Sequence, residues 1–180
     1  MFQRIRQGLR DAGTIKALCQ GAEQYALQEG QQQPGAEHFM LAALDLPDGS
    51  ARRTFERLGV DPAQVRGAIA KQYEQALRHI GIDPSALAAA GEGSQPARSK
   101  AGLYDASPSG QALIQALAEP GNCDRQGAPL LGAHVLAVIA TMEQGVAART
   151  LRALGMKLDA LANAAAQVIA QSGAGVQAQR

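Results

Sequence analysis

Apolar residues recur every three or four positions along much of the chain, which is the spacing of one face of an α-helix. One stripe runs through residues 15–26, and a second follows the Pro34-Gly35 break and ends at Leu46. Another covers residues 65–77. The alternation typical of β-strands is weak throughout. The pattern therefore predicts an all-α protein.

Residues with special backbone properties mark several helix ends. Gly59 follows Leu58, and glycine is typical of a helix C-terminus because it adopts the left-handed conformation without strain. Asp61 and Pro62 predict that the next helix begins there, with Asp61 as its N-cap. Ser107 before Pro108 predicts a further helix start of the same kind.

The strongest organisational signal is an internal repeat with a period of about 96 residues. Between His38–Val60 and His134–Met156, seven of twenty-three aligned positions are identical without a gap. Most remaining pairs match an apolar residue with another, as equivalent core faces require. One repeat cannot bury its apolar faces alone, so we expect the two repeats to pack together.

We therefore predict two pseudo-symmetric four-helix repeats packed as one compact bundle-like domain. Residues 1–90 form the first repeat in this interpretation, and 107–170 form the second. Residues 91–106 include the glycine, serine and proline typical of a linker. Residues 171–180 are small and polar, and we expect them to fray as a tail.

Two segments of the chain resemble a known family. Ala36–Leu44, with its Glu37-His38 pair, is similar to the Thr-Glu-His-Leu-Leu-Leu-Ala-Leu-Leu segment of the amino-terminal domain of Clp unfoldase chaperones. Gly145–Gly155 resembles the Gly-Val-Ala-Ala-Arg-Val-Leu segment of the same domain, with its closing Leu-Gly. The resemblance covers most of the chain, and it implies an eight-helix domain that docks substrates or adaptor proteins.

In full-length relatives the resemblance places this domain before two ATPase modules. The sequence contains no G-x-x-x-x-G-K-[S/T] phosphate loop. We therefore expect either a stand-alone version of the domain or a domain taken from a longer protein. The expected function is non-enzymatic binding of protein or peptide clients, with a Clp-type unfoldase, protease or adaptor as partner. Two alternatives stay open: a small all-α hydrolase or ligand-binding enzyme, and a structural accessory subunit of a larger protease ring.

Charge and composition narrow the classes of partner and compartment. The formal net charge of +1 gives no basic field for a phosphate backbone, so we expect no nucleic-acid binding. The start of the chain lacks the apolar run of a signal peptide, and no stretch approaches 18 apolar residues. We expect no membrane association and a cytoplasmic location, where Cys19 and Cys123 stay reduced.

His38 and His134 occupy equivalent positions in the two repeats. Each lies at the start of a helix, where an imidazole can bond the backbone of the first turn, so we expect a structural role. No set of ligands with zinc spacing surrounds them, and we expect neither a metal nor a cofactor. A catalytic pairing of Cys19 with a histidine stays a minor alternative, because no G-x-S-x-G or similar motif accompanies it.

Three carboxylates of the first repeat are the candidate binding residues, namely Glu37, Asp45 and Asp48. The second repeat has Ala133, Thr141 and Gln144 at the equivalent positions. The resemblance implies that the glutamate before the histidine grips phosphorylated arginine in some relatives, once in each repeat, and here only Glu37 is retained. The alternative for Glu37 is stabilisation of a helix N-terminus. We expect a basic segment to contact the side of the domain that carries these acids.

Overall fold

The computed structural model describes residues 2–83, 105–119 and 129–177, and within them the side chains of residues 11–173. The described residues form eight helices and no strand, which confirms the all-α prediction. The helices are α1 (Phe2–Gln28), α2 (Ala36–Leu44), α3 (Ser50–Arg57), α4 (Gln64–His79), α6 (Pro108–Ala118), α7 (Gly132–Ala140), α8 (Val146–Ala153) and α9 (Leu158–Gln177).

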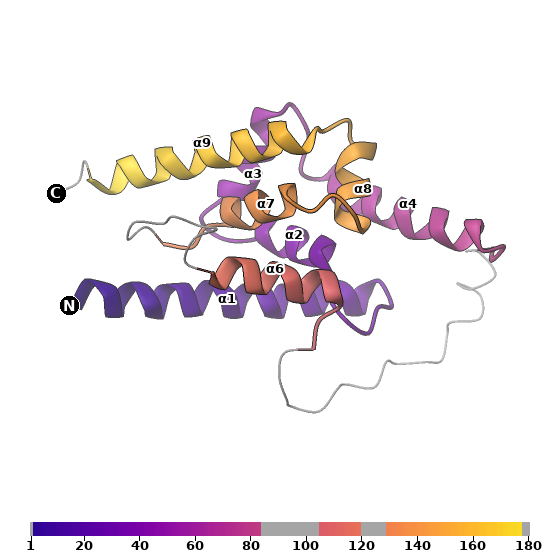
Figure 1. Ribbon diagram of the computed structural model, residues 1–180, viewed down its shortest axis with the longest axis horizontal. Helices are drawn as coiled ribbons and strands as arrows, with labels where there is room; N and C mark the ends of the chain where they lie inside the picture. The colour runs from indigo at the N-terminus through magenta and orange to yellow at the C-terminus, as the bar shows by residue number, and fades with distance from the viewer. Residues whose placement is uncertain (1, 84–104, 120–128, 178–180) are drawn as a thin grey trace.

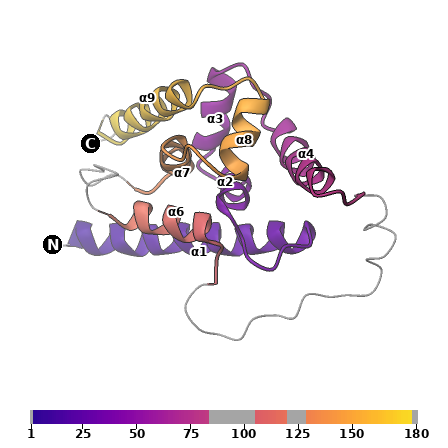
Figure 2. The same cartoon turned by 45° about the vertical axis from the view of Figure 1, so that its right-hand side comes forward.

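The helices α2 and α7 lie at the centre of the molecule and contact each other (Figure 1). Every residue of α2 is buried, and so is every residue of α7 except Ala137. A helix that is apolar all round needs neighbours on all sides. Figures 1 and 2 show how this is met: α1 runs along one side of the central pair, and α3, α8 and α9 cover the other.

The second and third helices of the two repeats correspond in position. The helix α7 begins 96 residues after α2, and α8 begins 96 residues after α3. Both α3 and α8 end in the same turn, in which Gly59 and Gly155 have positive φ values of 69° and 76°. The amides of Val60 and Met156 close each turn by donating to the carbonyls of Phe55 and Leu151. These contacts are those of a helix that ends at a glycine in the left-handed conformation, as the Leu-Gly pairs predict.

Packing crosses between the repeats. The helix α3 packs against α9, and α4 packs against α8. The two interfaces are related by the pseudo-symmetry, because each joins the third helix of one repeat to the last helix of the other. One hydrophobic core therefore runs through both repeats, from Leu18 and Phe55 in the first to Leu136 and Leu161 in the second. This confirms the predicted single domain of two repeats.

Serine side chains also cross between the repeats. Ser50 Oγ, at the start of α3, accepts a 2.8 Å hydrogen bond from the Ala133 amide in the first turn of α7. Ser109 Oγ, at the start of α6, accepts a 3.2 Å bond from the Ala36 amide in the first turn of α2. The amides of a first helical turn have no partner within the helix. Each central helix thus has at least one such amide bonded to a side chain of the other repeat.

Some boundaries differ from those expected. The helix α4 begins at Gln64, and Asp61 instead closes a turn ahead of it by accepting a 2.9 Å bond from the Ala63 amide. Residues 171–177, expected to fray, continue α9. Of the predicted linker, residues 91–104 lie outside the described residues, as does Cys123, while Ala106 is buried next to α6. Ser107 is the N-cap of α6, as predicted.

Candidate functional site

The two histidines at equivalent positions of the repeats fold back onto the turns that precede their helices. His38 is the third residue of α2, and its Nδ1 accepts a 2.8 Å hydrogen bond from the Gly35 amide. His134 is the third residue of α7, and its Nδ1 accepts a 3.0 Å bond from the Leu131 amide. Both rings are buried. An Nδ1 that accepts a hydrogen bond carries no proton itself, so in this arrangement each ring holds a proton on Nε2.

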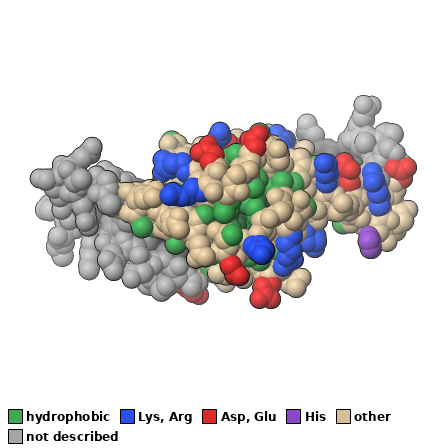
Figure 3. All heavy atoms as spheres, turned by 90° about the horizontal axis from the view of Figure 1, so that it is seen from above, with side chains coloured by type: hydrophobic (Ala, Val, Ile, Leu, Met, Phe, Trp, Pro, Cys, Tyr) green, Lys and Arg blue, Asp and Glu red, His purple; other side chains and the backbone are tan. Residues whose placement is uncertain are grey.

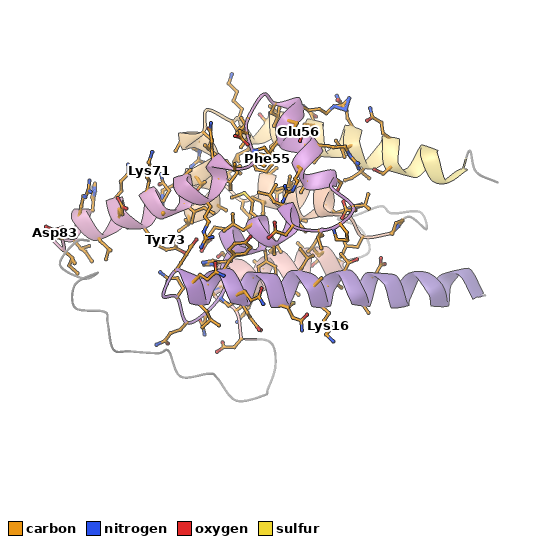
Figure 4. All side chains as sticks on the ribbon, turned by 180° about the vertical axis from the view of Figure 1, so that it is seen from behind. Lys16, Phe55, Glu56, Lys71, Tyr73 and Asp83 are labelled. Atoms are coloured by element: carbon orange, nitrogen blue, oxygen red, sulfur yellow. The ribbon has the colours of Figure 1, made fainter. Side chains whose placement is uncertain are left out.

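The first of these histidines lies among acidic and phenolic groups. His38 Nε2 is 3.3 Å from Glu29 Oε2, and its Nδ1 is 3.4 Å from Glu37 Oε1. The Tyr73 ring stacks on the imidazole with centroids 6.4 Å apart, and Tyr73 donates a 2.6 Å hydrogen bond to Glu37 Oε1. In Figure 4, Tyr73 points from α4 into the space beside α1, while Lys71 points away from it.

This cluster is closed to ligands in the structure. Glu37 is only 5% exposed, and its carboxylate folds back over Gly35. Burial and the Glu37 carboxylate together raise the pKa of Tyr73 well above its ordinary value, so the phenol stays a neutral donor. Glu37 therefore serves here to hold α4 against the start of α2.

The other two predicted acids have different surroundings. Asp45 follows α2 and is exposed; it accepts hydrogen bonds from the Tyr25 hydroxyl and from Arg52, 3.2 Å away. Burial, followed by the hydrogen bond to Asp45, raises the pKa of Tyr25 to about 12. Asp48 is half-buried and bridges the repeats, because it accepts bonds from the amides of Ser50 and Gly132. The structure does not bring Glu37, Asp45 and Asp48 together on one surface.

Two adjoining hollows lie in the surface of the first repeat. The first, of about 420 Å³, lies among α2, α3 and the start of α4, and we call it the α2–α4 hollow. The second, of about 460 Å³, lies along α1 and the end of α2, and we call it the α1–α2 hollow. Tyr25, Asp45 and Arg66 line both hollows. Asp45 is therefore the one predicted acid that contributes to an open concave surface.

Several residues around the cluster and the hollows were not predicted, because no motif in the sequence marks them. Tyr25 and Tyr73 were assigned to apolar stripes, although a hydroxyl that is carried into a core needs a polar partner. Glu29 follows α1 directly and had no motif to mark it. Asp61 and Glu56 line the α2–α4 hollow, but nothing in the spacing of an isolated turn and helix shows that they share a cavity.

A second face carries apolar side chains. Figure 3, viewed from above, shows hydrophobic side chains gathered at the centre of this face, with Lys and Arg side chains around them. Within the described residues, no group of three or more His, Cys, Asp or Glu side chains is arranged to hold a metal ion. No helix in that part of the chain has the length and hydropathy needed to cross a bilayer.

Residues 14–92 match the family model of the Clp repeat (R) N-terminal domain. The match spans most of α1 and all of α2, α3 and α4, so it includes both hollows and the cluster around His38. No curated protein matches the sequence.

Proposed function

Because residues 14–92 match the family model of the Clp repeat N-terminal domain, we propose that the chain is a non-enzymatic binding module for proteins or peptides that acts in or beside a Clp unfoldase–protease system. The family match is the observation that carries this proposal. A cytoplasmic location and partners of the Clp type, whether unfoldase, protease or adaptor, belong to the same proposal.

The geometry of the first repeat supports a binding role. Two adjoining hollows of about 420 and 460 Å³ are large enough for side chains of a bound segment. Contacts hold their shared wall together, because Tyr25 is bonded to Asp45 and lies under the Arg66 guanidinium, 5.6 Å from the ring centroid. A preformed surface costs less to order on binding than a flexible one.

The same geometry weakens the enzyme alternative. A catalytic pairing of Cys19 with a histidine needs an imidazole that can reach a substrate. The His38 ring is fully buried, its Nδ1 is bonded to the Gly35 amide, and its Nε2 faces Glu29. His38 is therefore committed to the fold rather than to a cleft.

The direct test is capture on the immobilised full chain of purified unfoldase, protease and adaptor subunits, and separately of a chemically unfolded client protein. We expect at least one of them to bind. Asp45→Lys, at the shared wall of the hollows, should weaken capture, while the control Lys71→Glu on the outer side of α4 should not. If none of these proteins binds the wild-type chain, the proposal is wrong.

Size-exclusion chromatography with a candidate ring separates this function from that of a structural accessory subunit. A free receptor should bind clients whether or not the ring is present. A ring subunit should co-elute with the assembled ring and show no affinity for clients alone.

A further inference from the structure

The α2–α4 hollow combines an apolar floor with a charged rim. Leu41 and Leu44 form part of its lining and are buried, so they offer only a small apolar surface at the bottom. Asp45, Glu56 and Asp61 contribute carboxylates, while Arg52 and Arg66 contribute guanidinium groups. Which of these groups still has bonding capacity decides what the hollow can recognise.

The guanidinium groups are already engaged. Arg52 donates from Nε to the Leu44 carbonyl at 2.6 Å and from its terminal nitrogen to Asp45. Arg66 donates to Gln28 Oε1 at 2.8 Å and lies over the Tyr25 ring. Because these contacts hold both guanidinium groups against the walls of the hollow, we do not assign ligand binding to either of them.

Two carboxylates keep open acceptor positions. Asp61 uses Oδ1 for the Ala63 amide, and its Oδ2 has no polar partner within the described residues. Within the described residues the Glu56 side chain also has no hydrogen bond or ion pair. Figure 4 shows Glu56 on α3 next to Phe55, which is fully buried. A carboxylate with open lone pairs is satisfied by the N–H donors of a cationic group. The open acceptor atoms of the hollow are therefore suited to the N–H donors of a cationic group.

The second repeat lacks this capacity at the equivalent positions. Residues 96 positions after Glu56 and Asp61 are Arg152 and Lys157, both exposed. The Asp45 equivalent is Thr141. The two halves thus differ by reversal of charge at two positions, and at these positions it is the first half that presents carboxylates.

We propose that the α2–α4 hollow takes one lysine or arginine side chain from an extended protein segment, with the methylene stem on Leu41 and Leu44 and the cationic head toward Glu56 and Asp61. This inference rests on the proposed function as a binder of protein segments. The flanking chain of the segment lies in the adjoining α1–α2 hollow, where the exposed amides of Gln20 and Gln24 can bond a peptide backbone. The floor suits a stem that is apolar below its charged end.

The experiment measures binding of short fluorescein-labelled peptides of glycine, serine and leucine to the full chain by fluorescence anisotropy. The central residue is lysine, arginine, norleucine or glutamate, and norleucine matches the lysine stem without its charge. We expect the lysine and arginine peptides to bind about tenfold more tightly than norleucine, as charge-assisted hydrogen bonds to two carboxylates predict. The advantage should shrink as salt rises.

The matched variants keep side-chain shape. Glu56→Gln with Asp61→Asn should remove the preference for a basic residue, while Asn still caps the Ala63 amide. The control Glu74→Gln removes one exposed carboxylate from α4 outside the hollow and should leave the preference unchanged. Replacing both acids by the residues of the second repeat, as Glu56→Arg with Asp61→Lys, should invert it in favour of glutamate.

The outcomes separate this inference from the proposed function. A basic preference that survives Glu56→Gln with Asp61→Asn overturns the assignment to this hollow, as does equal binding of the lysine and norleucine peptides. If no peptide binds while an unfolded client or a Clp subunit is captured, the inference is wrong and the proposed function stands. If no protein and no peptide binds, both the proposed function and this inference are wrong.

Discussion

His38 and His134 perform the same backbone task in different surroundings. Each accepts a hydrogen bond from the amide three residues earlier, and each is buried. Around His38, however, stand Glu29, Glu37 and Tyr73, whereas Ala133 replaces the glutamate beside His134. The stability lost when a side chain is truncated depends on the hydrogen bond that is removed and also on the polar groups that remain buried without a partner.

Truncation of the two histidines should therefore give unequal losses of stability. His38→Ala strands the Gly35 amide and leaves the buried Glu29 carboxylate without the ring beside it, so we expect about 3–4 kcal/mol. His134→Ala should cost about 1–2 kcal/mol less, because Ala133 stands where Glu37 stands beside His38, so the deletion leaves no carboxylate buried at that position. Urea unfolding followed by circular dichroism measures both. Equal losses would show that Glu29 contributes nothing to the difference.

The Tyr25 hydroxyl should lose its proton at a higher pH than an ordinary tyrosine does. Its pKa of about 12 exceeds the ordinary value of 10, so the folded chain holds the proton more tightly than the unfolded chain does. The stability that the neutral phenol contributes is complete below pH 10 and is lost as pH rises from about 10 through 12. The absorbance difference between wild type and Tyr25→Phe isolates this phenol. A midpoint near 10 while the chain is still folded would contradict the burial and the bond to Asp45.

At the scale of elements, the starts of the central helices depend on the partner repeat. The first turn of α7 is bonded by Ser50 and Asp48, and that of α2 by Ser109. Close approach accompanies these bonds: a Cβ on Gly132 would lie 2.8 Å from the Ala43 carbonyl oxygen. Glycine is thus required at Gly132 for contact between backbones and not for an unusual φ angle.

Two glycine substitutions should change stability in opposite directions. Gly132→Ala forces α7 away from α2 and should destabilise the chain by about 1–3 kcal/mol. Gly67→Ala lies in α4, where a Cβ meets nothing within 4 Å, and should stabilise it by about 0.5–1 kcal/mol through helix propensity. Thermal denaturation of both variants beside wild type gives the comparison. A neutral Gly132→Ala would mean that the two central helices can separate at little cost.

For the whole molecule, the crossed packing makes the two repeats one cooperative unit. The helix α4 completes the second repeat by packing on α8, and α9 covers α3 in return. Neither repeat can lose its structure and leave the other with a complete core.

Differential scanning calorimetry should accordingly show a single transition whose calorimetric and van't Hoff enthalpies agree. Leu113→Ala in the second repeat and Ile69→Val in the first, both at fully buried positions, should each move that same transition without splitting it. Two resolved transitions, or a shift of only part of the heat-absorption peak, would contradict a shared core.

Much of this organisation could be predicted because it depends on local spacing. The repeat period, the apolar stripes and the Leu-Gly turns located α2, α3, α7 and α8 to within a few residues. The binding surface was harder. Glu37 stands beside His38 in a motif, but whether its carboxylate faces solvent depends on Tyr73, 36 positions away on α4. Likewise Glu56 and Asp61 share a hollow only because α3 and α4 turn back on α2.

The crossed interfaces also bear on how such a chain arose. In each crossed interface the third helix of one repeat packs on the last helix of the other, as α3 does on α9 and α8 does on α4. If the two repeats were separate chains, this would be the arrangement of a symmetric dimer of identical subunits. Duplication and fusion of a gene for one such subunit would produce a repeat of this kind, with one common period of 96 residues. In a dimer of identical chains, every substitution appears on both sides. In a single chain the two halves can differ, and here one half carries Glu56 and Asp61 where the other carries Arg152 and Lys157, so a symmetric scaffold presents a one-sided surface.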